Sequence, residues 1–383
     1  MKKITVCNID EEGRFGGPER RIVLVAEGLI GHEVDVLLLI PQIDSDKFET
    51  EITCRNIPYK KINYARLTLE FWKLLRYVIR FPLDVLLTMS ALRESGNDLV
   101  HINGSYQFRS AIAAFLARKA IVWHVNDAKM HWAVKSVFLA LAPKIADGFI
   151  FSSLAARDYY FPQGFNEQRI KAITIPPPVQ PERFTGTRQK DSLINGKKTL
   201  SIVTVTGINP DKGVEYFIES AALIHASIPD VVFRVAAAIH SSQRKYFSTL
   251  QALVQEKGLS SLFQFVGFVD NIPQFLLDSD IFLYTSNTEA GPAAVWEAMA
   301  AGLPVVTTSV GAIPEYLEHG KHALIAPPRD AQRLSELTLQ LIHDEQLREK
   351  LANAGRKQVF DMLSVDAATQ KHIEIYSEVL KNA

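Results

Sequence analysis

Residues 284–315 constrain the fold of this chain more than any other stretch. They have the pattern of a strand end, a glycine turn, a short helix, a second strand, and another glycine turn into a helix. Pro292 stands where the first helix would begin, because its fixed φ suits the first helical position and its missing N–H would be unpaired there in any case. The free N–H groups and the positive dipole end of this helix then predict an anion site, most commonly for phosphate.

Two carboxylates flank the first turn of this stretch. Glu289 and Glu297 stand on either side of it with seven residues between them. Acids beside an anion site are consistent with one ligand that carries both phosphates and hydroxyl groups, because carboxylates accept hydrogen bonds from hydroxyls. A nucleotide sugar carries both, so the stretch predicts a nucleotide-sugar site.

These residues resemble the donor-binding signature of the retaining glycosyltransferases of family 4. The matching sequence is Glu289-x7-Glu297, then Ala-Met-Ala-Ala-Gly-Leu-Pro-Val-Val, then Val-Gly-Ala-Ile-Pro-Glu at 310–315. The resemblance covers nearly the whole chain, strongly at 199–328 and more loosely before it. It implies the α/β fold called GT-B, in which two Rossmann-like domains, each a doubly wound parallel sheet, face a cleft.

The resemblance also implies an activity, which is the retaining transfer of a hexose-type sugar from a nucleoside diphosphate sugar, such as a UDP-sugar, to an acceptor hydroxyl. Such enzymes commonly serve the assembly of bacterial surface polysaccharides, lipopolysaccharides or glycolipids, so a glycan or lipid-linked acceptor is expected. No Asp-x-Asp motif stands at the end of a predicted strand, so no essential metal is expected. No cofactor is expected besides the donor substrate.

Length and composition narrow the remaining classes. The 383 residues suit two domains, and 47% hydrophobic with 22% charged residues is an ordinary globular composition. Lysine plus arginine equals aspartate plus glutamate at 42 each, without the basic excess of a nucleic-acid binder. Cys7 and Cys54 are too few for a disulfide framework and indicate a reducing compartment. No apolar run reaches the length of a membrane span, so a cytoplasmic protein is expected.

Strands and helices alternate along the chain with one interruption. The proline-rich segment 176–181 and the polar stretch 185–198 indicate a boundary, because prolines restrict the chain and the polar residues have nothing to bury. The pattern predicts two Rossmann-like domains, an N-terminal one at 1–180 and a C-terminal one at 199–360. The resemblance implies that the first is the acceptor domain and the second the nucleotide-sugar donor domain. The resemblance implies that the last helix, within 365–383, packs back on the first domain.

The first domain begins with an apolar strand, a glycine-containing loop and a helix that starts at Pro18. The glycines do not form the G-x-G-x-x-G fingerprint of dinucleotide-binding proteins. Gly16, Gly17 and Glu19 match the family's Gly-Gly-x-Glu-Arg segment, which the resemblance places at the interdomain cleft. A plain strand-to-helix turn is the alternative interpretation.

Two further predicted strands, 98–103 and 120–125, bring polar candidates. The first resembles the family's Asp-x-Val-His strand, with His101 in place, and the second resembles a strand that usually ends in His-Asp. Asn126 occupies the position of that histidine near the sugar. Asparagine can still hydrogen-bond a hydroxyl, but it cannot take up a proton near neutral pH. For His101 and His124 the alternative interpretation is a core histidine.

The second domain carries a turn that ends in Lys-Gly after its first strand. Lys212 matches the family lysine that binds the donor diphosphate. Gly207 stands where the family usually has an arginine, so one expected diphosphate cation is missing. Lys212 would then act with helix N-termini alone, or with Arg14 or Arg20 of the first domain.

The resemblance assigns roles to these residues. Lys212 and the backbone N–H groups of 291–294 would stabilise the leaving diphosphate, Glu297 would hold the ribose hydroxyls, and Glu289 would hold the hydroxyls of the sugar. The catalytic candidates are Glu289, Lys212, Asn126 and His101. The donor-binding candidates, which include the predicted contact with the nucleotide base at 267–269, are Gly16, Gly17, Gly207, Lys212, Gly267, Phe268, Val269, Glu289, Ala290, Gly291, Pro292, Ala293, Ala294 and Glu297.

Residues 60–80 differ in character, because six basic residues are interleaved with aromatic ones and only Glu70 opposes them. Leucine, phenylalanine and valine residues here follow helical spacing, which predicts a basic amphipathic helix that Pro82 interrupts. Such a helix could lie peripherally on the anionic inner face of the membrane, near a lipid-linked acceptor. Alternatively, its apolar stripe packs into the N-terminal domain and its basic face is solvated.

Two other functions stay open. A nucleotide-sugar 2-epimerase shares the GT-B fold but not the run from Glu289 to Pro304, and it would change the sugar without an acceptor. A degenerate GT-B subunit, which binds a partner or a nucleotide without turnover, is favoured by Gly207 and Asn126.

Overall fold

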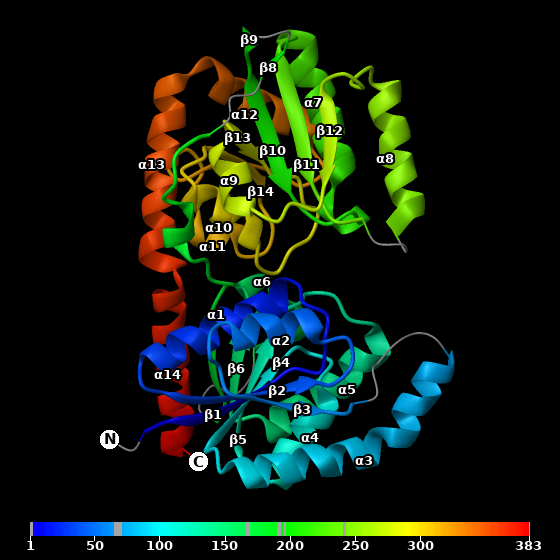
Figure 1. Cartoon of the computed structure of the whole chain (residues 1–383), viewed down its shortest axis with the longest axis vertical. Helices are drawn as coiled ribbons and strands as arrows, with labels where there is room; N and C mark the ends of the chain where they lie inside the picture. Colours follow the sequence, from blue (N-terminus) through cyan, green and yellow to red (C-terminus); the bar gives the residue numbers. More distant parts are fainter. Residues whose placement is uncertain are drawn as a thin grey trace. The chain divides into compact units, whose positions relative to one another are not determined.

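The structure is a computed structural model that describes residues 3–64, 71–164, 169–189, 193–194, 197–239 and 243–382. The chain divides into two compact units (Figure 1): Met1–Pro178 with Val365–Ala383, and Val179–Ser364. We refer to the first as the N-terminal unit and to the second as the C-terminal unit.

The described part of the N-terminal unit is built on a seven-stranded parallel sheet with the order β3-β2-β1-β4-β5-β6-β7. The strands are β1 Thr5–Ile9, β2 Asp35–Pro41, β3 Tyr59–Ile62, β4 Leu99–Asn103, β5 Ala120–Val125, β6 Gly148–Phe151 and β7 Lys171–Thr174. The helices are α1 Gly17–Gly31, α2 Asp46–Thr53, α3 Phe71–Ser95, α4 Phe108–Leu116, α5 Trp132–Ile145, α6 Leu154–Tyr160 and α14 Val365–Asn382.

Both faces of this sheet are covered by helices. Successive side chains of a strand point to opposite faces, so neighbouring residues of β1 pack against different helices. Val6 of β1 belongs to an apolar cluster with residues of α1, α2 and α14. The next residue, Cys7, belongs to a second cluster with residues of α3, α4 and α5. The near-continuous apolar runs of the sequence are therefore interior strands.

The described part of the C-terminal unit has a six-stranded parallel sheet with the order β12-β11-β10-β13-β14-β15. The strands are β10 Leu200–Val205, β11 Val231–Ala236, β12 Phe263–Gly267, β13 Ile281–Leu283, β14 Val305–Thr308 and β15 Leu324–Ala326, with a small hairpin of β8 Leu193–Ile194 and β9 Lys197–Lys198. The helices are α7 Val214–Ser227, α8 Arg244–Glu256, α9 Ile272–Leu277, α10 Ala293–Ala300, α11 Ile313–Tyr316, α12 Ala331–His343 and α13 Glu345–Met362, with 3-10 turns η1 Pro181–Phe184 and η2 Pro210–Lys212.

The two sheets share one topological feature. In each sheet the first three strands along the chain lie side by side, with the third at the edge: β3-β2-β1 in one and β12-β11-β10 in the other. The fourth strand, β4 or β13, lies on the opposite side of the first strand. The chain therefore leaves β1 toward one side of the sheet and β4 toward the other. The same holds for β10 and β13 in the second sheet. Such a switch point opens a crevice at the carboxyl ends of the two strands, where ligands bind in doubly wound sheets.

The expected class of two doubly wound α/β domains is confirmed. The units meet along the chain at Pro178, and residues of the expected linker form η1. The C-terminal helix α14 belongs to the N-terminal unit, where it packs on α1, β5 and β7.

Two proline predictions need correction. Pro292 is the N-cap of α10 rather than its first residue, because its ψ of 72° is not helical while its carbonyl already accepts a bond from the Val295 N–H at 2.9 Å. Pro82 does not interrupt its helix but lies inside α3. Proline has no N–H to donate to the carbonyl four residues earlier in the helix. Because Pro82 is exposed, water can bind that carbonyl instead.

We predict that Gly28→Ala destabilises the N-terminal unit. A Cβ at Gly28 in α1 would lie 2.2 Å from Oγ1 of the buried Thr369 in α14, so the two helices would have to separate. Overpacking of this kind reduces the free energy of unfolding by about 1–3 kcal/mol, measurable by urea denaturation.

Gly31→Ala is the matched control in the same helix, since a Cβ there meets nothing within 4 Å. It is expected to be neutral or slightly stabilising. Equal losses in the two variants would contradict close packing of α14 on α1.

Candidate active site

Two loops meet at the switch point of the C-terminal unit, one after β10 and one after β13. Side chains of the second loop bind the backbone of the first: Thr285 Oγ1 donates to the Gly213 carbonyl at 2.8 Å, and Ser286 Oγ donates to the Asp211 carbonyl at 3.0 Å. The Asn287 N–H donates to the same Asp211 carbonyl at 2.8 Å. The loops are thus held as one polar surface at the strand ends.

This surface carries an ion pair between Lys212 and Glu289, the two predicted catalytic residues of this unit. The Glu289 carboxylate also accepts the Tyr284 hydroxyl at 2.6 Å and the Ala290 N–H at 3.1 Å. Burial, and then the charge of Glu289, raise the pKa of Tyr284 well above its usual range, so this hydroxyl stays a donor. Both side chains of the ion pair remain partly exposed, at 25% for Lys212 and 14% for Glu289, so a ligand can reach them.

Two glycines are needed for this arrangement. Gly213 has a φ of +60°, and a Cβ on it would lie 2.2 Å from the Thr285 carbonyl oxygen. Gly311 has a φ of +53°, and a Cβ on it would lie 2.5 Å from the Glu289 carbonyl oxygen. Because the close atoms are backbone, a larger residue at either position would displace the loop that carries Glu289.

The predicted donor-binding residues 290–294 form the turn before α10 and its first residues. The N–H of Ala293 donates to the Gly291 carbonyl at 3.0 Å, so this N–H is already used inside the turn. Glu297 lies one helical turn further along α10 and is 8% exposed. The helix N-terminus and Glu289 therefore lie in one continuous segment.

The remaining predicted positions of this unit also lie at strand ends. Gly207 follows β10, and a Cβ there would approach only the Asn209 side chain, at 3.4 Å. Gly267 ends β12 with a φ of +75°, and Phe268 after it is 62% exposed, with Val269 next along the chain. An exposed ring at this end of the sheet is the kind of group on which a nucleotide base can stack.

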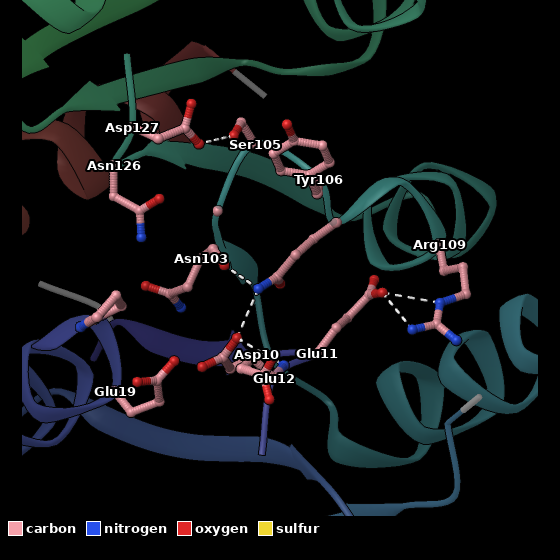
Figure 2. A pocket seen from close by; sticks show the side chains of 13 residues that line it. Asp10, Glu11, Glu12, Glu19, Asn103, Ser105, Tyr106, Arg109, Asn126 and Asp127 are labelled. Carbon is pink, nitrogen blue, oxygen red and sulfur yellow. Dashed lines mark hydrogen bonds and ion pairs between the residues drawn. The ribbon is translucent and has the colours of Figure 1, made fainter. Parts of the chain in front are cut away.

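The N-terminal unit has a pocket of about 300 Å³ at its own switch point (Figure 2). Its walls come from the segments after β1, β4 and β5 and from the start of α1 and α4. The lining residues are Asp10, Glu11, Glu12, Pro18, Glu19, Asn103, Gly104, Ser105, Tyr106, Gln107, Arg109, Asn126 and Asp127. Asn126, a predicted catalytic residue, is among them; Gly16 and Gly17 lie at the N-terminus of α1, next to the lining residue Pro18.

Acidic groups dominate this pocket. Asp10 accepts Gln107 Nε2 at 2.7 Å on Oδ1, and Glu19 accepts the Gly16 N–H at 2.7 Å, which caps α1. Burial is the main cause that raises the pKa of Asp10 well above its usual range, with a further contribution from the charge of Glu19. Burial also raises the pKa of Glu19 and of Asp127.

The cation of the pocket, Arg109, is 1% exposed and bound on every side. Its Nε and Nη2 donate to Glu11 Oε2 at 2.8 and 2.6 Å, and its Nη1 donates to Asp84 Oδ2 at 2.9 Å. The guanidinium also lies 4.8 and 4.6 Å from the ring centres of Tyr64 and Tyr77. Arg109 thus fixes α3 and α4 to the loop after β1 and is neutralised by its two acids.

His101 requires a correction, because the structure places it away from this pocket. It lies fully buried beneath α14, where its Nδ1 contacts the Tyr376 hydroxyl at 2.5 Å and its ring stacks on those of His124 and His372. Burial lowers the pKa of all three histidines, so they are neutral core residues. A substrate cannot reach His101 there.

The same three histidines bring their ring nitrogens within 4.8 Å of one another, which raises the question of a metal. The rings of His101 and His124 are nearly parallel, at 13°, so their in-plane lone pairs do not converge. The Arg21 guanidinium lies 2.5 Å from His124 Nδ1 and opposes a second cation. These residues therefore fit a metal ion poorly.

The prediction missed Tyr284, Asp10, Gln107 and Asp127. Each of them follows a strand by one to a few residues, and a polar residue directly after an apolar strand is the signal that could have found them. That signal does not tell which strand ends are neighbours, because strand order is a property of the sheet.

Each of the two units, which are both built on a parallel sheet, thus carries a polar site at its switch point. Family models match both units. The model described as "Glycosyltransferase Family 4" matches residues 15–183, and that of "Glycosyl transferases group 1" matches residues 186–358. The chain belongs to this family, the group 1 glycosyltransferases of GT-B fold.

Individual relatives agree with this assignment. N-acetyl-alpha-D-glucosaminyl L-malate synthase of Bacillus anthracis is 29% identical over 136 residues, 36% of this chain and 36% of that protein. The amylovoran biosynthesis glycosyltransferase AmsK of Erwinia amylovora is 29% identical over 175 residues, 44% of this chain and 41% of that protein. The match thus spans less than half the length of either curated relative.

A solved structure shows the same fold over nearly the whole chain. Anabaena Alr3699/HepE, in complex with UDP and glucose, superposes with a TM-score of 0.82 at 20% identity, over 98% of this chain and 100% of that one. No helix within the described residues combines the length and the apolar character that crossing a bilayer requires.

We predict that Asp10→Asn stabilises the protein. Because the pKa of Asp10 is raised in the folded state, the folded state binds this proton more tightly, and the free energy of unfolding falls as the pH rises from the usual aspartate pKa through the raised one. The amide removes this loss, so the melting temperature at pH 8 should rise by about 2–4 °C, and the gain should shrink toward pH 4.

Glu349→Gln, at an exposed position on α13, is the control and should leave the melting temperature unchanged. A lower melting temperature for Asp10→Asn at pH 8 would show instead that the buried carboxylate stabilises the fold.

Proposed function

We propose that the protein is a retaining glycosyltransferase that moves a hexose-type sugar from a nucleoside diphosphate sugar, such as a UDP-sugar, to an acceptor hydroxyl. The observation that carries the proposal is the Lys212–Glu289 ion pair beside the N-terminus of α10, at the switch point of β10 and β13. A role in bacterial surface polysaccharide or glycolipid synthesis is supported by the name of the relative AmsK, an amylovoran biosynthesis enzyme.

The ion pair suggests how the donor would bind. A diphosphate offers Lys212 a stronger partner than one carboxylate, so Lys212 would turn to the diphosphate and release Glu289. Glu289, still held by the Tyr284 hydroxyl and the Ala290 N–H, would then accept hydrogen bonds from the sugar hydroxyls. Glu297 would hold the ribose, and Phe268 would lie against the base.

The leaving diphosphate develops negative charge, which fixed donors stabilise best because they need no rearrangement. Lys212 and the positive end of the α10 dipole supply this stabilisation without a metal ion or a cofactor in our proposal. Gly207 stands where the family usually has an arginine, so the donor affinity should rest mainly on Lys212.

The test is a thermal-shift panel of UDP, GDP, ADP, CMP and dTDP. A ligand that binds only the folded state raises the melting temperature, and at a hundred times its Kd it adds about 2.7 kcal/mol of stability. We expect one nucleoside diphosphate to stabilise the wild type, and Glu297→Ala and Gly311→Ala to lose this shift.

Gly320→Ala is the control for Gly311→Ala, because Gly320 also has a positive φ, of +77°, but a Cβ on it meets nothing within 4 Å. Gly320→Ala should lower the melting temperature of the free protein about as much as Gly311→Ala does, and its melting temperature should still rise when the nucleotide binds. If no nucleotide stabilises the wild type, or if Gly320→Ala abolishes the shift as well, the proposed donor site is wrong.

A binding subunit without turnover is the second candidate, and Gly207 and Asn126 favour it because each replaces a residue type that the family uses at its site. Nucleotide release from the donor separates the two candidates. Donor that binds but is neither hydrolysed nor transferred under an acceptor screen would support the binding subunit.

We also propose that α3 rests on the anionic inner face of the cytoplasmic membrane. Its outward side exposes apolar side chains: Ile79, Leu83 and Leu86 are 69%, 51% and 54% exposed, and Leu74, Leu75 and Val78 are exposed as well. The opposite side buries Tyr77 and Val85. Of the predicted apolar stripe, Leu74, Leu75 and Val78 do not pack inside the domain, which counts against the predicted alternative at these positions. The predicted helix is also too long at its start, because residues 60–62 belong to strand β3, and positions 65–70 lie outside the described residues.

Charge supports an anionic bilayer as the partner of this face. Between Phe71 and Leu87 the acid is Asp84, which is buried and paired with Arg80 and Arg109, while Arg76 is exposed. An apolar face with cations beside it binds the interface of anionic lipids.

Co-sedimentation with vesicles rich in phosphatidylglycerol tests this contact. The wild type should sediment with these vesicles at low salt and less with phosphatidylcholine, and Ile79→Asp should stay in the supernatant. Leu223→Asp, on an exposed position of α7, is the control that should still bind. Failure of the wild type to bind at low salt would exclude the membrane contact.

A further inference from the structure

We propose that the pocket at the β1–β4 switch point is the acceptor site, and that it selects an acceptor whose bound end is hydroxyl-rich and not anionic, such as a sugar ring. Acceptors with a phosphate or a carboxylate at that end would be rejected. This inference rests on the proposed function, because it takes the transfer of a sugar for granted and names the class of its second substrate.

The charge of the pocket wall is the first argument. Its lining includes the carboxylates of Asp10, Glu11, Glu12, Glu19 and Asp127 against one guanidinium, that of Arg109. That guanidinium is fully engaged by Glu11 and Asp84, so it adds no free positive charge. Glu11 is paired with Arg109 and Glu12 with Arg14, so the lining acids that an anionic ligand would meet outside an ion pair are Asp10, Glu19 and Asp127. Their negative potential opposes the binding of an anion.

Nearby arginines add no free cation to the pocket. Arg14 places its Nε and Nη2 on the two carboxylate oxygens of Glu12, each at 3.1 Å. Arg21 is buried and donates to Asn103 Oδ1 at 2.7 Å and to His124, behind the pocket wall. Both cations are thus held by groups of the protein and do not line the pocket.

Two buried acceptor atoms of the pocket wall support the proposal independently of charge. Asp10 is 4% exposed and Gln107 is 6% exposed, and both line the pocket. Asp10 Oδ2 and Gln107 Oε1 have no hydrogen-bond partner in the described structure. Asp10 is seen in Figure 2 at the pocket wall between Glu19 and the loop after β4.

The orientation of these two groups is fixed by their other atoms. Gln107 Nε2 donates to both Asp10 Oδ1 and the Asn103 carbonyl, so its amide oxygen cannot exchange places with the nitrogen without losing two bonds. Asp10 Oδ1 also accepts the Glu12 N–H at 3.2 Å. The unpartnered oxygens are therefore fixed, unsatisfied hydrogen-bond acceptors. A ligand that donates hydrogen bonds to them removes the unfavourable cost of leaving them unpaired.

A sugar ring can bind both oxygens because each of its hydroxyls is a hydrogen-bond donor, whereas ionised phosphate and carboxylate groups only accept. An amino sugar supplies donors too, so the shared chemistry is a non-anionic hydrogen-bond donor. The volume of about 300 Å³ lies at the small end of the range for ligand pockets and suits one ring rather than a long chain.

The experiment compares sugars with the same ring that carry a neutral, a cationic or an anionic group at one position. Methyl glucoside, methyl galactoside and methyl mannoside are each paired with the 2-amino, the uronate and the 6-phosphate analogue. Binding to the nucleotide-loaded wild type is followed by saturation-transfer NMR. We expect at least one neutral or amino sugar to bind and its uronate and 6-phosphate analogues to bind about tenfold more weakly or not at all.

Asp10→Asn should lower the affinity for the sugar about fivefold or more, because it removes an acceptor of the sugar hydroxyl's hydrogen bond. Since this variant is predicted to be more stable than the wild type, a loss of binding does not reflect unfolding. Asp158→Asn, exposed on α6 and outside the pocket, is the matched control and should bind like the wild type.

The outcomes separate this inference from the proposed function. If a nucleoside diphosphate binds, but the anionic sugars bind as well as the neutral ones or Asp10→Asn binds unchanged, the inference is wrong while the donor site stands. If no nucleoside diphosphate binds, the proposed function itself fails.

Discussion

At the centre of each sheet the chain leaves two neighbouring parallel strands in opposite directions, from β1 and β4 in one unit and from β10 and β13 in the other. Two loops that leave a common edge on opposite sides cannot fill the space between them, so a crevice opens at the strand ends. Both polar sites of the protein lie at such a crevice. The apolar strands and the covering helices hold its walls in place.

The two crevices differ in chemistry, although their topology is the same. In the C-terminal unit a lysine is paired with a carboxylate beside a helix N-terminus, a set that suits a ligand with phosphates and hydroxyls. In the N-terminal unit the cation is neutralised and buried, and the other polar lining groups are acids, amides and hydroxyls, among them unpartnered oxygens of Asp10 and Gln107. One fold thus provides an anion-tolerant site and an anion-rejecting site.

Lys212, Glu289 and Glu297 could be singled out from the sequence because they belong to local strand–turn–helix segments with recognisable turn residues, and the structure brings the first two together in an ion pair. The sequence did not predict the acidic pocket, since Asp10, Gln107 and Asp127 become neighbours only through the order of β1, β4 and β5. His101 was misplaced for a similar reason. The helix that buries it, α14, is about 270 residues further along the chain.

Hydrogen–deuterium exchange with and without saturating nucleoside diphosphate tests the central claim most directly, because it reports where the nucleotide acts on the whole chain. We predict slower exchange in the loop after β10 and in the segment from Glu289 to Glu297, and little change in the loop after β4. Protection confined to the loops of the N-terminal unit, or no protection at all, would contradict the assignment of the donor site.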